Sequence, residues 1–148
     1  MEPHTVWCLQ SDHADSGHVK AGQGYALGAV EDSLPINVMV ADQFSSFLEP
    51  DHGRVQDLGE LNVYGHVEPV AVRTLDTVLP ALRERLGFER PYLKLDTQGF
   101  DMEVLRGGSD SLSTVRALQT EASVIGIYKG MPTYMEMIRY LWRARLPS

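Results

Sequence analysis

The sequence predicts an α/β domain, because apolar, strand-like runs alternate with helix-like stripes through its second half. Residues 92–96 form the clearest case: an apolar run ends on Asp96, a turn follows at Gly99, and a helical pattern begins at Phe100. Strands of open α/β sheets end in this way because the ligand crevice opens at their carboxyl ends. Alternation of this kind predicts a mostly parallel sheet with right-handed crossovers.

Size and composition indicate one globular domain. The chain has 148 residues, of which 43% are hydrophobic, and this suits a single core spanning residues 1–148. Thirteen Lys and Arg against twenty Asp and Glu give a net charge of -7, which would repel a phosphate backbone. We therefore expect no nucleic-acid partner.

The single cysteine and the hydropathy pattern indicate the compartment. Cys8 is alone, so an intrachain disulfide is impossible and a reducing compartment fits. No stretch resembles a signal peptide or a run of about 20 apolar residues. We expect a cytoplasmic protein with no membrane partner.

In the first half, residues 25–30 and 34–40 are predicted to form two short strands of a hairpin or of successive sheet positions. The second strand alternates apolar side chains at the strand period. Residues 45–65 carry one proline and three glycines and few consecutive apolar residues, so they are predicted to form a loop. A loop of this length in a small domain is usually functional or mobile.

The second half continues with a strand at 67–72 and a helix that is capped by Asp76 and ends at Gly87. After the strand at 92–96, a helix at 100–106 is followed by Gly107 and Gly108, interpreted as left-handed residues at its end. Residues 118–128 are predicted to form another strand. The last helix is predicted to start near Pro132 and to carry one apolar face, formed by Tyr134, Met137, Ile138, Leu141 and Trp142.

Five short motifs, in order, give the chain a resemblance to a known family. They are Tyr25 to Gly28, Ser45 to Leu48, Thr74 to Asp76, Leu93 to Asp101 with Val104 to Gly107, and Gln119 to Glu121 followed by Tyr128. Each motif alone is weak, but their order and spacing resemble the FkbM-type S-adenosylmethionine-dependent methyltransferases. The resemblance runs from about residue 24 to residue 128.

This resemblance implies a Rossmann-like methyltransferase sheet that binds the methyl donor S-adenosylmethionine above the carboxyl ends of the early strands. The acceptor would enter beside it, and usual acceptors are hydroxyl groups on sugars or natural products. The family's glycine-rich cofactor loop is absent from this sequence, so the sheet is expected to lack its first βα unit. The opening Met1-Glu2-Pro3 resembles the end of the family's second strand, where Glu2 would bind the ribose hydroxyls. The alternative is that Glu2 is a frayed terminal residue.

Methyl transfer to an oxygen requires a base for the hydroxyl proton, and a carboxylate at the sheet edge suits that role. Asp96 and Glu121 are the candidates for catalysis, and Asp96 is also expected beside the cofactor. Asp96 is placed at the end of one strand and Glu121 early in the next, so two neighbouring strands would bring both acids to one crevice. The alternative for each acid is capping of an adjacent helix.

The resemblance places Ser45, Ser46 and Gln98 near the acceptor, as substrate-binding residues. The alternative for the serines is hydrogen bonding to nearby backbone. Residues 12–18 contain histidines and aspartates, but their spacing matches no ligand pattern, so no metal site is predicted.

Two functional hypotheses follow. The first is an O-methyltransferase of the FkbM type that acts on a small-molecule hydroxyl, either active or inactive as this chain alone, since the amides that hold the donor's carboxypropyl end have no evident substitute. The second is a non-catalytic α/β interaction module that forms a homodimer through an exposed sheet edge.

Overall fold

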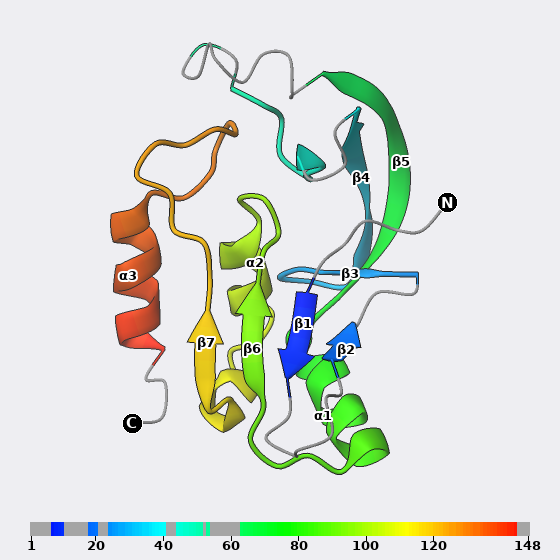
Figure 1. The fold of residues 1–148 in the computed structure, drawn as a ribbon, viewed down its shortest axis with the longest axis vertical. Coiled ribbons are helices and arrows are strands. Elements are labelled where there is room, and N and C mark those ends of the chain that lie inside the picture. The colour runs from blue at the N-terminus through cyan, green and yellow to red at the C-terminus, as the bar shows by residue number, and fades with distance from the viewer. Residues whose placement is uncertain are drawn as a thin grey trace.

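The structure is a computed structural model that describes residues 7–10, 18–20, 24–40, 44–51, 53 and 63–144. Figure 1 shows strands, helices and connecting loops arranged as an α/β domain. The elements are β1 (Trp7–Gln10), β2 (His18–Lys20), β3 (Ala26–Leu27), β4 (Asp32–Met39), β5 (Tyr64–Arg73), α1 (Leu75–Leu86), β6 (Tyr92–Leu95), α2 (Asp101–Arg106), a 3₁₀ turn η3 (Ser111–Thr114), β7 (Ala117–Gln119) and α3 (Tyr134–Arg143).

The described strands form two sheets, in the orders β2-β1-β6-β7 and β3-β5-β4. Only β6 with β7 and β3 with β5 are parallel; β1 with β2, β1 with β6, and β4 with β5 are antiparallel. The α/β class is confirmed, whereas the prediction of a mostly parallel sheet is wrong for these pairings. Hydrophobic patterning reports which face a strand buries but not the direction of its neighbour, so the sequence could not supply this information.

Strand β6 lies at the centre of the four-stranded sheet, between β1 and β7 (Figure 1). Its Leu93 and Leu95 are fully buried, whereas Tyr92 and Lys94 are only partly buried. The core cluster joins these leucines to α1, α2 and α3, through Leu75, Val78, Leu79, Leu82, Met102, Val104, Leu105 and Met137 among others. The carboxyl end of β6 is therefore fixed by the hydrophobic core, and this fixes the position of the residues that follow it.

Helix α1 confirms the predicted stripe and corrects its cap. Thr74, not Asp76, occupies the N-cap position, and its hydroxyl accepts a hydrogen bond from the Thr77 amide. The carboxylate of Asp76 instead accepts the amides of Ser111 at 2.7 Å and Asp110 at 3.3 Å. Gly87 ends the helix in the left-handed conformation, as predicted.

The glycine pair after α2 serves close packing and not a left-handed helix end. Gly107 has a φ of -74°, and neither it nor Gly108 is among the described residues with positive φ. A Cβ atom at Gly107 would overlap the carbonyl oxygen of Gly28, and one at Gly108 would lie 2.6 Å from a Leu75 side-chain carbon. The prediction of left-handed residues is therefore wrong here, because the constraint comes from a distant segment.

Helix α3 begins at Tyr134 with a capping box, in which Thr133 accepts the Glu136 amide and the Glu136 carboxylate accepts the Thr133 amide. The predicted apolar face is only partly correct. Met137 is buried, but Ile138 is 46% exposed and Trp142 is 85% exposed. The predicted strand at 118–128 is also shorter than expected, because β7 ends at Gln119 and the chain continues as a loop to an isolated bridge between Tyr128 and Pro50.

The described part of the predicted loop after β4 lies against two other segments of the chain. Its described part, residues 44–51, pairs with Asn37 on one side and with residues 127–129 on the other. None of the described helices has the length and apolar character needed to cross a membrane.

Candidate functional site

The site begins with the turn that follows β6. The amide of Phe100 bonds to the carbonyl of Thr97 at 3.3 Å, and the two central residues, Gln98 and Gly99, have φ values of 51° and 89°. A β-turn with two positive φ values favours glycine or asparagine at both positions, so a glutamine there is unusual. Strained residues of this kind persist where the surroundings hold them, often at functional sites.

Asp101, at the start of α2, holds this turn to the end of β7. Its side chain is 2% exposed, and its carboxylate accepts hydrogen bonds from the amide and hydroxyl of Thr97, the hydroxyl of Thr120 and the amide of Glu121. The donors come from the ends of two neighbouring strands. A buried carboxylate with several hydrogen-bond donors is well compensated, so Asp101 fixes the geometry of the sheet edge.

Asp96 directly follows β6 and faces this edge. Its carboxylate accepts a hydrogen bond from the Gln98 side-chain amide at 3.1 Å and lies 4.0 Å from the ammonium of Lys94. The side chain is 28% exposed. The alternative role as a helix cap is not realised in the described structure, because Phe100 is the N-cap of α2 and no side chain caps it.

Glu121 follows β7 as Asp96 follows β6. The last pair of the parallel register is Lys94 with Gln119, and Asp96 and Glu121 each lie two residues further along the chain, beyond the strand ends. Partial burial, followed by the negative charges of Asp96 and Asp101, raises the pKa of the Glu121 carboxyl, whereas Lys94 lowers it. The structure thus brings together the two acids that the sequence singled out.

The hydroxyls of the two predicted substrate-binding serines bond to the protein itself. Ser46 is 1% exposed; its hydroxyl donates to the carbonyl of Gln98 at 2.8 Å and accepts from the Leu48 amide at 3.0 Å. The hydroxyl of Ser45 accepts from the Met39 amide. The Ser46 hydroxyl therefore connects the loop at 44–51 to the turn at Gln98. The observed hydrogen bonds of both serines are those of the alternative role, in which their hydroxyls bond to nearby backbone.

Tyr128 is a member of the site that the sequence argument matched to the family without assigning it a role. Its buried hydroxyl lies 2.9 Å from the carbonyl oxygen of Phe44 and 3.2 Å from the side-chain oxygen of Gln98, both hydrogen-bond acceptors. Burial, with smaller contributions from the charges of Glu121 and Asp96, raises the pKa of Tyr128. The phenol therefore stays protonated and helps to hold the Gln98 side chain.

Sequence reasoning also missed the central place of Asp101. An acid in the first turn of a helix is common as a partner of the helix dipole, so its pattern did not separate it from Glu103. The available signal was the combination of Thr97 and Thr120, two hydroxyl donors placed just after the two strand ends. Glu2 lies outside the described residues. In the part of the chain that the structure describes, no three histidine, cysteine or acidic side chains are arranged to hold a metal ion.

These features define an α/β domain with two coupled acids at the carboxyl edge of a parallel strand pair. The family model of the methyltransferase FkbM domain matches residues 8–145, and the chain belongs to this family. No curated protein matches the chain. No solved structure matches it.

The family implies the use of S-adenosylmethionine in general, and the described residues fit only part of that molecule. Asp96 and Glu121 offer carboxylate acceptors suited to hydroxyl groups. Strand β1, however, enters this edge by its amino end, since Trp7 pairs with Leu95, and so it supplies no loop from a strand's carboxyl end. No glycine-rich loop for the donor's own carboxylate is present in the described part of the chain, so the described residues do not fit the whole donor.

Proposed function

We propose that this domain is an O-methyltransferase that uses S-adenosylmethionine to methylate a hydroxyl group of a sugar or natural product. Membership of the FkbM methyltransferase family supports methyl transfer. The observation that carries the finer proposal is the placement of Asp96 and Glu121 at the ends of adjacent parallel strands.

In this proposal Glu121 accepts the proton of the acceptor hydroxyl. A general base works best when its pKa approaches the working pH, and partial desolvation, followed by the neighbouring acids, raises the pKa of Glu121 in that direction. Asp96 lies 4.0 Å from the Lys94 ammonium and accepts a hydrogen bond from the Gln98 amide. The two acids therefore take different roles, with Glu121 as the base and Asp96 held beside it by these contacts.

The experiment is transfer of a labelled methyl group from S-adenosylmethionine to a panel of sugars and phenols, by the wild type and by Glu121→Gln. Loss of a general base typically costs about 10²- to 10⁴-fold in rate, so the variant should lose at least about 10²-fold in kcat. Circular dichroism should show an unchanged fold, since Glu121 lies on the surface and its carboxyl is only partly desolvated.

A second candidate, a non-catalytic module that forms a homodimer, is favoured by one observation. Trp142 and Ile138 expose apolar side chains on one face of α3, and Val124 and Ile125 are exposed in the preceding loop. Exposed apolar surface of this kind can mark an interface. Sedimentation equilibrium of the wild type and of Trp142→Lys, combined with a donor titration, separates the candidates: a module dimerises through this surface and shows no donor-dependent stabilisation.

A further inference from the structure

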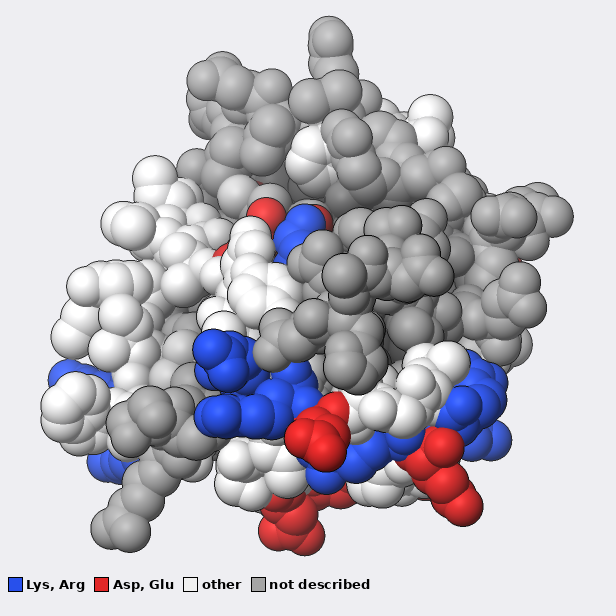
Figure 2. All heavy atoms as spheres, turned by 60° about the horizontal axis from the view of Figure 1, so that its bottom comes forward, with Lys and Arg blue, Asp and Glu red and all other residues white. Residues whose placement is uncertain are grey.

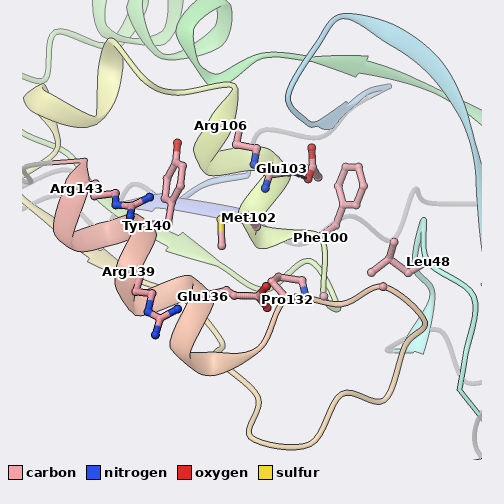
Figure 3. Close-up of a pocket in the computed structure, with 12 residues that line it drawn as sticks. Leu48, Phe100, Met102, Glu103, Arg106, Pro132, Glu136, Arg139, Tyr140 and Arg143 are labelled. Carbon is pink, nitrogen blue, oxygen red and sulfur yellow. Dashed lines mark hydrogen bonds and ion pairs between the residues drawn. The ribbon is translucent and has the colours of Figure 1, made fainter.

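A groove between α2 and α3 adjoins the candidate site. It encloses about 440 Å³ and is lined at one end by Leu48, Gly99 and Phe100, next to the turn that carries Gln98. Its other end is lined by Arg139 and Arg143 of α3 (Figure 3). We call this cavity the α2–α3 groove. A molecule that reaches the edge at Asp96 could therefore extend along it.

The walls of the α2–α3 groove combine apolar and charged side chains. The apolar part is lined by Phe100, Met102 and Pro132, together with Tyr140. The hydroxyl of Tyr140 donates to the carbonyl of Leu105 at 3.0 Å, so the tyrosine is fixed in place and its hydroxyl is already bonded. This apolar part suits an apolar stem, because burying it removes apolar area from water.

The charges in the α2–α3 groove are unequal, since three arginines and two glutamates line it. Glu103 is paired with Arg106 in the same helix. The carboxylate of Glu136 accepts the amide and hydroxyl of Thr133 at 2.8 and 2.7 Å, and these bonds, with a smaller contribution from the charge of Arg139, lower its pKa. Both negative charges therefore have partners close in sequence, and the charge of Arg139 is partly balanced by Glu136.

Three arginines against two glutamates leave one net positive charge in the groove, and Arg139 and Arg143 form its cationic end. They lie one turn apart on α3, at a spacing that places side chains on one face. Neither guanidinium forms a hydrogen bond or an ion pair with another residue in the described part of the chain. In a chain whose net charge is -7, this local excess requires a specific explanation.

We propose that the α2–α3 groove binds an anionic group of the acceptor, a carboxylate or a phosphate monoester, carried on an apolar stem. Arginine presents planar, always charged donors that match these oxygen groups in pairs. Arg139 and Arg143 bind the anion, and the apolar walls hold the stem with its hydroxyl directed to Glu121. This inference rests on the proposed methyl transfer for calling the ligand an acceptor.

The test measures binding alone, without any methyl donor, so its failure is distinguishable from failure of the proposed methyl transfer. Calorimetry compares 4-hydroxyphenylacetate, 4-hydroxyphenyl phosphate and the neutral 4-hydroxyphenylacetamide. The anion that the groove accepts should bind at least about tenfold more tightly than the amide, as expected for one charge-assisted hydrogen bond or more. Comparison of the two anions distinguishes a carboxylate from a phosphate as the preferred group.

The variant pair is Arg139→Gln with Arg143→Gln, and its matched control is Arg85→Gln with Arg90→Gln, which removes the same charge from exposed positions outside the groove. The groove variant should lose at least about tenfold in anion affinity, and the control less than about twofold. Replacement of both groove arginines by lysine should restore part of the affinity. Equal binding of the amide, equal losses in the two variant pairs, or no binding of any probe at millimolar concentration would overturn the proposal.

Discussion

Asp101 shows how a single buried residue can organise a site without taking part in its chemistry. Its carboxylate gathers donors from Thr97, Thr120 and Glu121, and it leaves Asp96 and Glu121 at the edge. Partial desolvation, followed by the negative charges of Asp96 and Asp101, then raises the pKa of Glu121. Mutations can therefore separate the structural role of Asp101 from the proposed proton transfer by Glu121.

Replacing Asp101 with alanine should reduce the free energy of unfolding by about 2 to 4 kcal/mol, because several donors at a buried position lose their acceptor. Chemical denaturation measures this change. Asp110→Ala is the control: Asp110 is exposed and its side chain makes no capping bond, so the change should stay within about 0.5 kcal/mol. Equal effects of the two substitutions would show that Asp101 does not hold the edge.

The charge coupling at the edge predicts pKa shifts of opposite sign in two variants. Asp96→Asn removes a negative charge and should lower the pKa of Glu121, whereas Lys94→Gln removes a positive charge and should raise it. Titration of the Glu121 carboxyl carbon by NMR measures both shifts. If Glu121 is the base, the acid limb of the activity profile should move in the same directions.

The same coupling has a consequence for stability. Because the native state raises the pKa of Glu121, it binds the proton more tightly than the unfolded chain does. The stabilisation is therefore present at low pH and is lost as the pH rises through the raised pKa of the folded state. For Asp96→Asn and Lys94→Gln, shifts of the Glu121 pKa in the same direction would contradict the charge coupling.

At the scale of elements, local patterns predicted what local forces determine. The stripe of α1, the left-handed Gly87 and the short helix α2 follow from side chains within a few residues of one another. The roles of Asp76 and Gly107 depend instead on segments distant in sequence, namely the amides at 110 and 111 and the backbone at Gly28. Asp96 was predictable from its position after a strand, whereas Glu121 was placed inside a predicted strand that ends at Gln119 instead. The role of Tyr128 required knowledge of the loop at 44–51.

The contact between α2's end and the start of the chain's second sheet can be tested at Gly107. Gly107→Ala should reduce the free energy of unfolding by about 3 kcal/mol or more, because the new methyl group meets the rigid carbonyl of Gly28. Gly126→Ala is the matched control, since the nearest atom to its Cβ is 3.8 Å away and φ is not positive. Thermal and chemical denaturation measure both. A tolerated alanine at Gly107 would show that the two backbones can separate at little cost.

At the scale of the whole molecule, the net charge is -7. On the face at the bottom of Figure 1, described basic side chains gather with acidic ones beside them (Figure 2). Arg139 and Arg143 form the cationic end of the α2–α3 groove, whose other end adjoins the turn at Gln98. In the proposal, the groove therefore connects these arginines with the candidate site.

The central claim is that Glu121 is the proton acceptor in methyl transfer to a hydroxyl group. The most direct measurement is labelled methyl transfer from S-adenosylmethionine to hydroxyl acceptors, including the anionic phenols, by the wild type and by Glu121→Gln. The account predicts transfer to an acceptor oxygen by the wild type and a loss of at least about 10²-fold in kcat for the folded variant. A folded Glu121→Gln variant as active as the wild type, or a wild type that neither binds the donor nor transfers its methyl group, would contradict it.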